Sequence, residues 1–235
     1  MELKVNQEQI DRLYRFTREH FVEHYDLQTE LVDHLSNAIE EEWKENPKLS
    51  FEEALQKEFK KFGVFGFSDV VEQRQSALTK RYHKFVWNNF KAFFKLPKII
   101  LTVGLMGILF QTLQVVSFKL AIVIALLIGF VIVYSYFVYQ TSKKFKEKKK
   151  IDERRWIMEE MIFNYGTLTA YPILLNLFFQ IVNFKSISFE NSYVQLVFSI
   201  IFVSIGILFY VLTKIIPSKA EDYLKQTYPE YAFSK

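Results

Sequence analysis

Three histidines and a glutamate near the N-terminus have the types and spacing that could support chemistry. His20 and His24 are four residues apart, and so are Glu30 and His34. Residues at this spacing lie on one face of an α-helix, and two such histidines with a third ligand form a zinc-type ligand set. If the two helices that carry them form an antiparallel hairpin, His20, His24, Glu30 and His34 approach one another.

A structural role for the same residues is the stronger interpretation. Glu30 and His34 lie at one edge of the apolar stripe of their helix, while Asp33 points to roughly the opposite side. The chain has no cysteine, nucleophile–base pair, phosphate loop or cofactor motif. We therefore expect no metal, no cofactor and no enzymatic activity. Proton sensing by the histidines stays open, because histidine titrates near neutral pH.

Capping signals predict a helical domain over residues 1–75. Asn6 with Gln9, and Ser50 with Glu53, have the spacing of capping boxes, which predicts helices over residues 6–24 and from residue 51. Asp26 is the predicted N-cap of a helix over residues 27–45. The expected buried side chains are Ile10, Leu13, Tyr14, Thr17, Phe21, Tyr25, Leu27, Leu31, Val32, Leu35, Ala38, Ile39, Trp43, Phe51, Ala54, Leu55, Phe59 and Phe62.

Four long stretches contain no Asp, Glu, Lys, Arg or His, and each is close to the roughly 20 residues that a helix needs to cross a bilayer. They predict transmembrane helices over residues 99–118, 120–141, 161–183 and 193–214. No segment alternates with a period of two, so no sheet is expected. The predicted fold is all-α: an N-terminal cytoplasmic helical domain followed by a polytopic bundle of four transmembrane helices.

Lysine and arginine residues gather on one side of the predicted spans. They are dense before the first span and in a basic loop over residues 142–160, and Lys214, Lys219, Lys225 and Lys235 follow the last apolar stretch, at the start of and within a tail over residues 215–235. The other side has only Lys119 and Lys185. Because positive residues mark the cytoplasmic side, we expect both termini in the cytoplasm.

A connector over residues 76–98 joins the domain to the first span. As a helix it has a basic face opposite an aromatic face, which suits the surface of an anionic membrane. The alternative is that the aromatic face packs on protein. No other feature resembles a nucleic-acid module, so lipid is the expected partner. The membrane-surface residues predicted here are Lys80, Arg81, Lys84, Trp87, Lys91, Lys95 and Lys98.

Apart from Lys214 at the end of the last span, the spans have no ionisable side chain other than tyrosine, which weakens a transporter hypothesis. Their uncharged polar residues could line a path or pocket, but hydrogen bonds between helices are the favoured explanation. Small residues in the spans allow close contacts, either within the chain or in a homo-oligomer. The polar candidates are Gln111, Gln114, Asn164, Asn176 and Gln180.

Several motifs between residues 30 and 63 are similar to the permease prefix domain of bacteria and to the HAAS-type helical domain. They are ELVDHL (30–35), SFEEAL (50–55) and FKKFG (59–63), in which the matching positions are caps and core residues. The resemblance implies a cytoplasmic accessory or signalling domain on a protein of the bacterial inner membrane. This chain departs from the permease pattern in its four spans and its lack of a large external domain.

These observations predict a non-enzymatic regulatory or adaptor protein with a cytoplasmic protein partner. An acidic helix end at Glu40, Glu41, Glu42 and Glu45 is one surface that could meet a basic partner. The alternative is a small transporter or channel component, or an accessory subunit of a permease.

Overall fold

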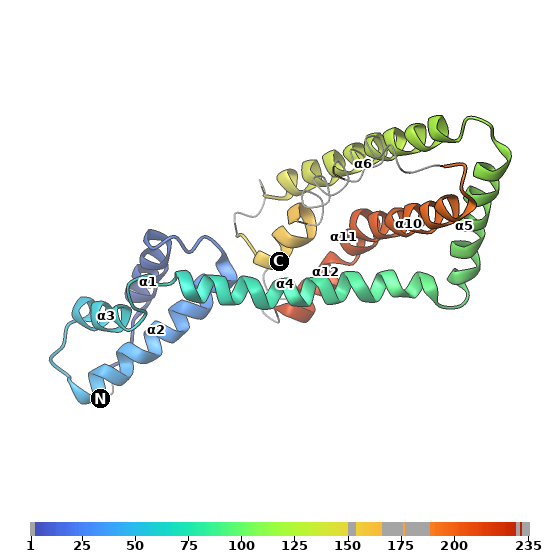
Figure 1. Ribbon diagram of the computed structural model, residues 1–235. Helices are drawn as coiled ribbons and strands as arrows, with labels where there is room; N and C mark the ends of the chain where they lie inside the picture. Colours follow the sequence, from blue (N-terminus) through green and yellow to red (C-terminus); the bar gives the residue numbers. More distant parts are fainter. Residues whose placement is uncertain (1–2, 150–153, 166–175, 177–188, 229–230, 232–235) are drawn as a thin grey trace. The chain divides into compact units, whose positions relative to one another are not determined.

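The computed structural model describes the chain except for residues 1–2, 150–153, 166–175, 177–188, 229–230 and 232–235 (Figure 1). Every regular element among the described residues is helical, which confirms the all-α prediction for them. The chain divides into two compact units. The first comprises residues 1–80 and 152–157, and the second comprises residues 81–151 and 158–235.

The first unit is built from helices. They are α1 (Gln7–Glu19), α2 (Tyr25–Glu45), α3 (Phe51–Lys60) and the first half of α4 (Ser68–Lys91). Both predicted capping boxes are present, at Asn6 with Gln9 and at Ser50 with Glu53. The prediction of Asp26 as an N-cap is wrong, because α2 begins at Tyr25, two residues before the predicted start, and its N-cap is His24. The buried Asp26 carboxylate instead accepts the backbone N–H of Ile157 at 3.4 Å.

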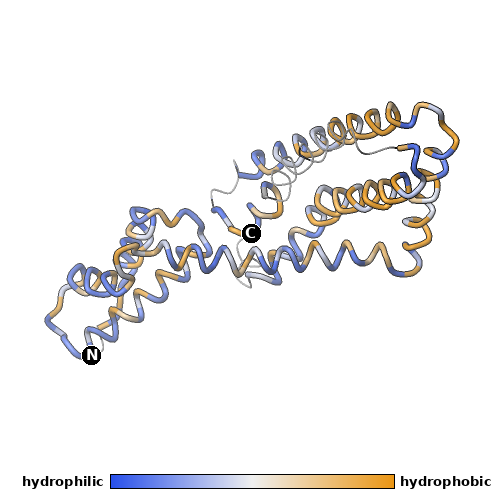
Figure 2. The backbone as a smooth tube through the Cα atoms, in the orientation of Figure 1, coloured by the Kyte–Doolittle hydropathy of each residue, from blue (hydrophilic) through white to orange (hydrophobic). Residues whose placement is uncertain are grey.

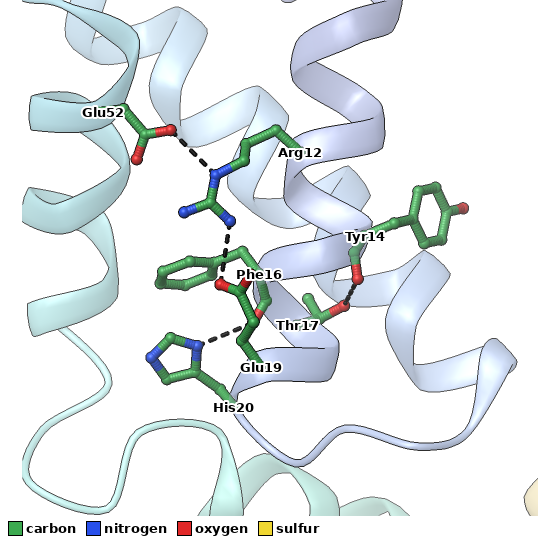
Figure 3. A network of polar contacts seen from close by, with 7 residues as sticks. All are labelled: Arg12, Tyr14, Phe16, Thr17, Glu19, His20 and Glu52. Carbon is green, nitrogen blue, oxygen red and sulfur yellow. Dashed lines mark hydrogen bonds and ion pairs between the residues drawn. The ribbon is translucent and has the colours of Figure 1, made fainter.

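The predicted aliphatic stripes form the core of the first unit. Leu13, Leu27, Leu35, Ile39 and Leu55 are completely buried. Arg12 ties α1 to α3 above this core: its guanidinium lies 3.1 Å from the Glu52 carboxylate and 3.2 Å from that of Glu19 (Figure 3).

The prediction that Phe21 belongs to the buried stripe of the first helix is wrong, because its side chain is 91% exposed. The helix ends at Glu19 rather than at residue 24, and Phe21 follows it with a φ of +63°, so it no longer shares the helical face. Phe16 and Val22 are buried instead. Phe16 belongs to a group of packed rings, here called the aromatic cluster, which comprises Phe16, His20, Phe59, Phe62 and Phe67.

Long apolar helices dominate the second unit (Figure 2). Its main elements are α5 (Lys98–Val115), α6 (Lys119–Lys149) and α10 (Ser192–Tyr210), which continues through a π-helical turn, Val211–Ile215, into α11 (Ile216–Ser218). Among the described residues, three helices are long and apolar enough to cross a membrane: Lys98–Val115, Lys119–Lys149 and Ser192–Ser218. Most of the predicted span over residues 161–183 lies outside the described residues.

The segments expected to be a loop and a tail are largely helical. The basic run after residue 142 continues α6 as far as Lys149, and α7 (Ile157–Glu160) leads into a π-helical turn, Met161–Tyr165. Near the C-terminus, α12 (Ala220–Thr227) buries Tyr223 and Leu224, and Tyr228 beyond it is also buried. Both segments carry apolar side chains that are buried, such as Phe145, Met158 and Leu224, and their burial explains the difference.

Candidate functional site

The four candidate metal ligands do not form one site. The Nδ1 atom of His20 lies 2.8 Å from the carbonyl oxygen of Phe16 (Figure 3). The centre of the His20 ring lies 4.3 Å from that of the Phe59 ring. His34 lies edge-on to the Phe62 ring at 6.0 Å, and Glu30 lies 3.6 Å from Arg74. Across the described ranges, no group of three potential ligands is placed to hold an ion. The rings around His20 come from Phe16 in α1, Phe59 in α3 and Phe67 just before α4.

The aromatic face of the predicted connector packs on protein, as the alternative proposed. The Phe85 ring stacks on that of Tyr223 in α12 with centroids 4.1 Å apart. Asn89 Nδ2 donates to the Tyr223 hydroxyl at 2.7 Å, and Arg81 donates to the carbonyl oxygen of Gln226. Burial raises the pKa of Tyr82 on the same face. The second half of α4 is therefore a docking face for α12.

The predicted membrane-surface lysines remain accessible. Lys80, Lys84, Lys91 and Lys95 are exposed. Trp87, which is 56% exposed, stacks on Phe90 at 5.5 Å, and the Lys91 ammonium lies 5.6 Å from the centre of the Trp87 ring. An exposed tryptophan beside lysines is typical of the boundary between membrane and water.

The predicted polar residues of the spans differ in their exposure. Gln111 and Asn176 are exposed, Gln114 and Asn164 are half-buried, and Gln180 lies outside the described residues. The sequence interpretation missed Gln195 in α10, which is fully buried and donates to the carbonyl oxygen of Phe189 at 2.6 Å. Its spacing with Phe198, Ser199 and Phe202 is that of one helix face, which was the available signal.

A groove lies along α5 and α10 in the second unit, with a volume of about 1060 Å³. One end is polar and is lined by Asn89, Lys98, Ser218 and Lys219. The Lys219 ammonium donates to Asn89 Oδ1 at 3.2 Å, and that of Lys98 lies 4.7 Å from the centre of the Phe93 ring. The rest of the lining is mostly apolar, with Leu105, Ile108, Leu126, Phe202 and Ile207 among its residues. The groove is thus amphipathic along its length.

Three exposed apolar side chains lie beside the aromatic cluster of the first unit. They are Phe21, Val64 and Phe65, which are 91%, 98% and 73% exposed. Phe21 directly follows His20, and Phe65 directly precedes Gly66. His20 and Gly66 both approach the ring of Phe59, so the two loops adjoin one another. We call these three residues the loop patch.

No family model matches the sequence, and no curated protein or solved structure shows significant similarity to it. The resemblance to the permease prefix domain therefore stays a prediction that rests on the motifs of residues 30–63.

Proposed function

We propose that this chain is a regulatory adaptor of the bacterial inner membrane, without enzymatic activity, whose first unit binds a protein partner through the loop patch. The observation that carries the proposal is the exposure of Phe21, Val64 and Phe65 in a unit that otherwise buries most of its large apolar side chains. Adjacent exposed apolar side chains of this kind mark interaction sites.

The backbone at Phe21 supports a functional reason for this exposure. Its φ of +63° is unfavourable for an aromatic residue, and the exposed ring recovers no burial energy in return. Strained backbone at an exposed aromatic residue is a feature of binding loops, because the scaffold holds the side chain ready for a partner.

The charges beside the loop patch indicate the chemistry of the partner. Arg18 and Lys60, in the last turns of α1 and α3, are exposed and lead into the two loops. We infer an apolar partner segment flanked by acidic residues. The acidic end of α2 is less suited to binding, because Glu40 accepts the backbone N–H of Val5 and Glu42 pairs with Lys57.

Contacts at the two ends of α6 support four crossings. At its start, Lys119 lies 2.7 Å from Glu190, just before α10; at its end, Lys149 pairs with Glu160. The 31 residues of α6 rise about 45 Å. The chain at Glu160 and the chain at Glu190 therefore lie at opposite ends of α6, and the apolar run of residues 161–184 between them has the length of one crossing.

The charges at the ends of the spans support cytoplasmic termini. The basic residues from Lys143 to Lys149 follow the apolar part of α6, whereas Lys119 at the other end is balanced by Glu190. The positive end faces the cytoplasm by the usual charge rule. The transport alternative gains no comparable support, because Gln111 and Asn176 are both exposed.

Site-specific photocrosslinking in cells tests the adaptor proposal. A photoreactive amino acid at Phe21 or Phe65 of the full chain should crosslink to one discrete protein, and the same group at Glu41, an exposed position on α2, should not. Adding Phe21→Ser to the Phe65 probe should abolish the crosslink, and the contacted peptide should be apolar with acidic neighbours. Crosslinks to lipid alone, or equal yields at Glu41, would overturn the proposal.

A further inference from the structure

We propose that the groove along α5 and α10 is a binding site for one anionic phospholipid, with the acyl chain against the apolar lining and the phosphate group at Lys98 and Lys219. This is a site of the second unit and is independent of the partner that the loop patch binds.

The distribution of polarity along the groove matches an amphiphile. Lys98 begins α5, and Thr112 lies 14 residues further along the same lining. At 1.5 Å per residue this is about 21 Å, which exceeds the roughly 15 Å depth of one leaflet of a bilayer core. All the charged lining residues lie at the Lys98 end. A soluble anion would need only that end, whereas a lipid uses the whole length.

The lysines of the polar end are placed to receive an anion. Among the described residues, neither Lys98 nor Lys219 forms an ion pair, and the groove has no carboxylate in its described lining. Asn89 orients Lys219 by accepting from its ammonium, while the Asn89 amide is itself held by Tyr223. Two ammonium groups at one end of an apolar groove favour a headgroup with a net negative charge over a zwitterionic headgroup.

The apolar part of the groove has open space at Gly206. A Cβ atom added at this glycine of α10 would meet nothing within 4 Å. A larger side chain here can therefore point into the groove without displacing the backbone. Gly206→Leu consequently tests the acyl-chain part of the site separately from the headgroup part.

Native mass spectrometry of the full-length protein tests the proposal. Micelles would contain equal amounts of phosphatidylglycerol and phosphatidylcholine with identical acyl chains, and a parallel sample would receive glycerol phosphate. We expect one phosphatidylglycerol retained per chain, with no retained glycerol phosphate. Lys98→Gln with Lys219→Gln should lower the preference for phosphatidylglycerol about tenfold or more.

Matched variants separate a built site from general surface charge. Lys91→Gln with Lys95→Gln removes two nearby lysines that do not line the groove and should leave retention unchanged. Lys98→Arg with Lys219→Arg should preserve it, while Gly206→Leu should reduce retention of both lipids. Equal retention of the two lipids by the unaltered chain, or an equal loss with the Lys91 and Lys95 pair, would overturn the proposal. Retained glycerol phosphate would also overturn it, in favour of a soluble anion.

Discussion

The two units of the chain place their apolar side chains in opposite ways. In the first unit, Leu13, Leu27, Leu35 and Leu55 are completely buried under exposed charged faces. In the second unit, only 11% of the apolar stretch of α5 and 11% of that of α6 is buried, and the corresponding share for Ser192–Ser218 is 28%. Large side chains such as Ile100, Val103 and Val115 on α5 are exposed instead.

This difference shows which solvent each unit is built for. Burial of apolar surface from water drives the folding of the first unit. The outward side chains of the spans gain little from packing within the chain, so their stability requires a hydrocarbon environment, in which association depends on close packing and hydrogen bonds. Replacement of a large apolar side chain by alanine should therefore change the free energy of unfolding by different amounts in the two units.

The largest expected effect is at Leu35, which is completely buried. Leu35→Ala should lower the free energy of unfolding of the first unit by about 2–5 kcal/mol, because it leaves a cavity in the core. Ile100→Ala, at a position that is 70% exposed, should leave that free energy unchanged. Urea denaturation of the full chain in phosphatidylcholine nanodiscs would compare the two.

Tryptophan fluorescence can monitor the unfolding of the first unit alone. With Trp87→Phe as the background, the remaining Trp43 and Trp156 both belong to that unit. Similar losses for Leu35→Ala and Ile100→Ala would refute the contrast drawn between the units.

Two glycines of the first unit sharpen the comparison, because one is enclosed by its core and the other is not. Both have positive φ: +78° at Gly63 and +54° at Gly66. A Cβ added at Gly66 would lie 2.9 Å from Cζ of Phe59, within the aromatic cluster, whereas at Gly63 it would meet nothing within 4 Å. Gly63→Ala should lower the free energy of unfolding by about 1–2 kcal/mol, which is the penalty for a positive φ at a residue with a Cβ atom. Gly66→Ala should cost about 1–3 kcal/mol more, from overpacking.

The same urea titration measures both glycine variants. If the two variants lose the same free energy of unfolding, the Phe59 ring moves aside at little cost. The aromatic cluster would then not be tightly packed.

The sequence was sufficient for features that depend on local chemistry. The capping boxes at Asn6 and Ser50 were predicted correctly, because each requires only two side chains three residues apart. The apolar runs of α5, α6 and α10 were predicted for the same reason, since composition alone decides whether a helix suits a bilayer.

Features that depend on tertiary contacts were missed. Periodicity assigned Phe21 to the core, but α1 ends two residues earlier and positive φ turns the side chain outward. The docking of α12 on α4 requires Phe85 and Tyr223, which are 138 residues apart, to stack. The groove was not predicted either, because its lining residues come from α4, α5, α6, α10 and α11, which are far apart in the sequence.

The smallest expected effect concerns an ion pair at the surface of the first unit. Glu42 lies 2.5 Å from the ammonium of Lys57 and 3.7 Å from that of Lys61. The hydrogen bond from Lys57 holds the pKa of the Glu42 carboxyl below its ordinary value of 4.5. The unfolded chain therefore takes up this proton at a higher pH than the folded chain does. The stabilisation from Glu42 is complete above pH 4.5 and is lost as the pH falls through the folded-state pKa.

Glu42→Gln should accordingly make the urea midpoint of the first unit less sensitive to pH than it is in the unaltered chain. The difference should be seen between about pH 6 and about pH 3, the range that surrounds the ordinary carboxyl pKa and extends below it. Lys57→Met should reduce the pH sensitivity in the same direction, and the double variant should add little, because both changes remove one interaction. The Lys57 side chain is 51% exposed, so high salt should weaken the effect as well. Additive effects of the two substitutions would show that Glu42 and Lys57 act independently. The acid sensitivity of this unit would then have to come from other carboxylates, such as Glu53 in its capping box, whose pKa is lowered by the hydrogen bond from the Ser50 hydroxyl.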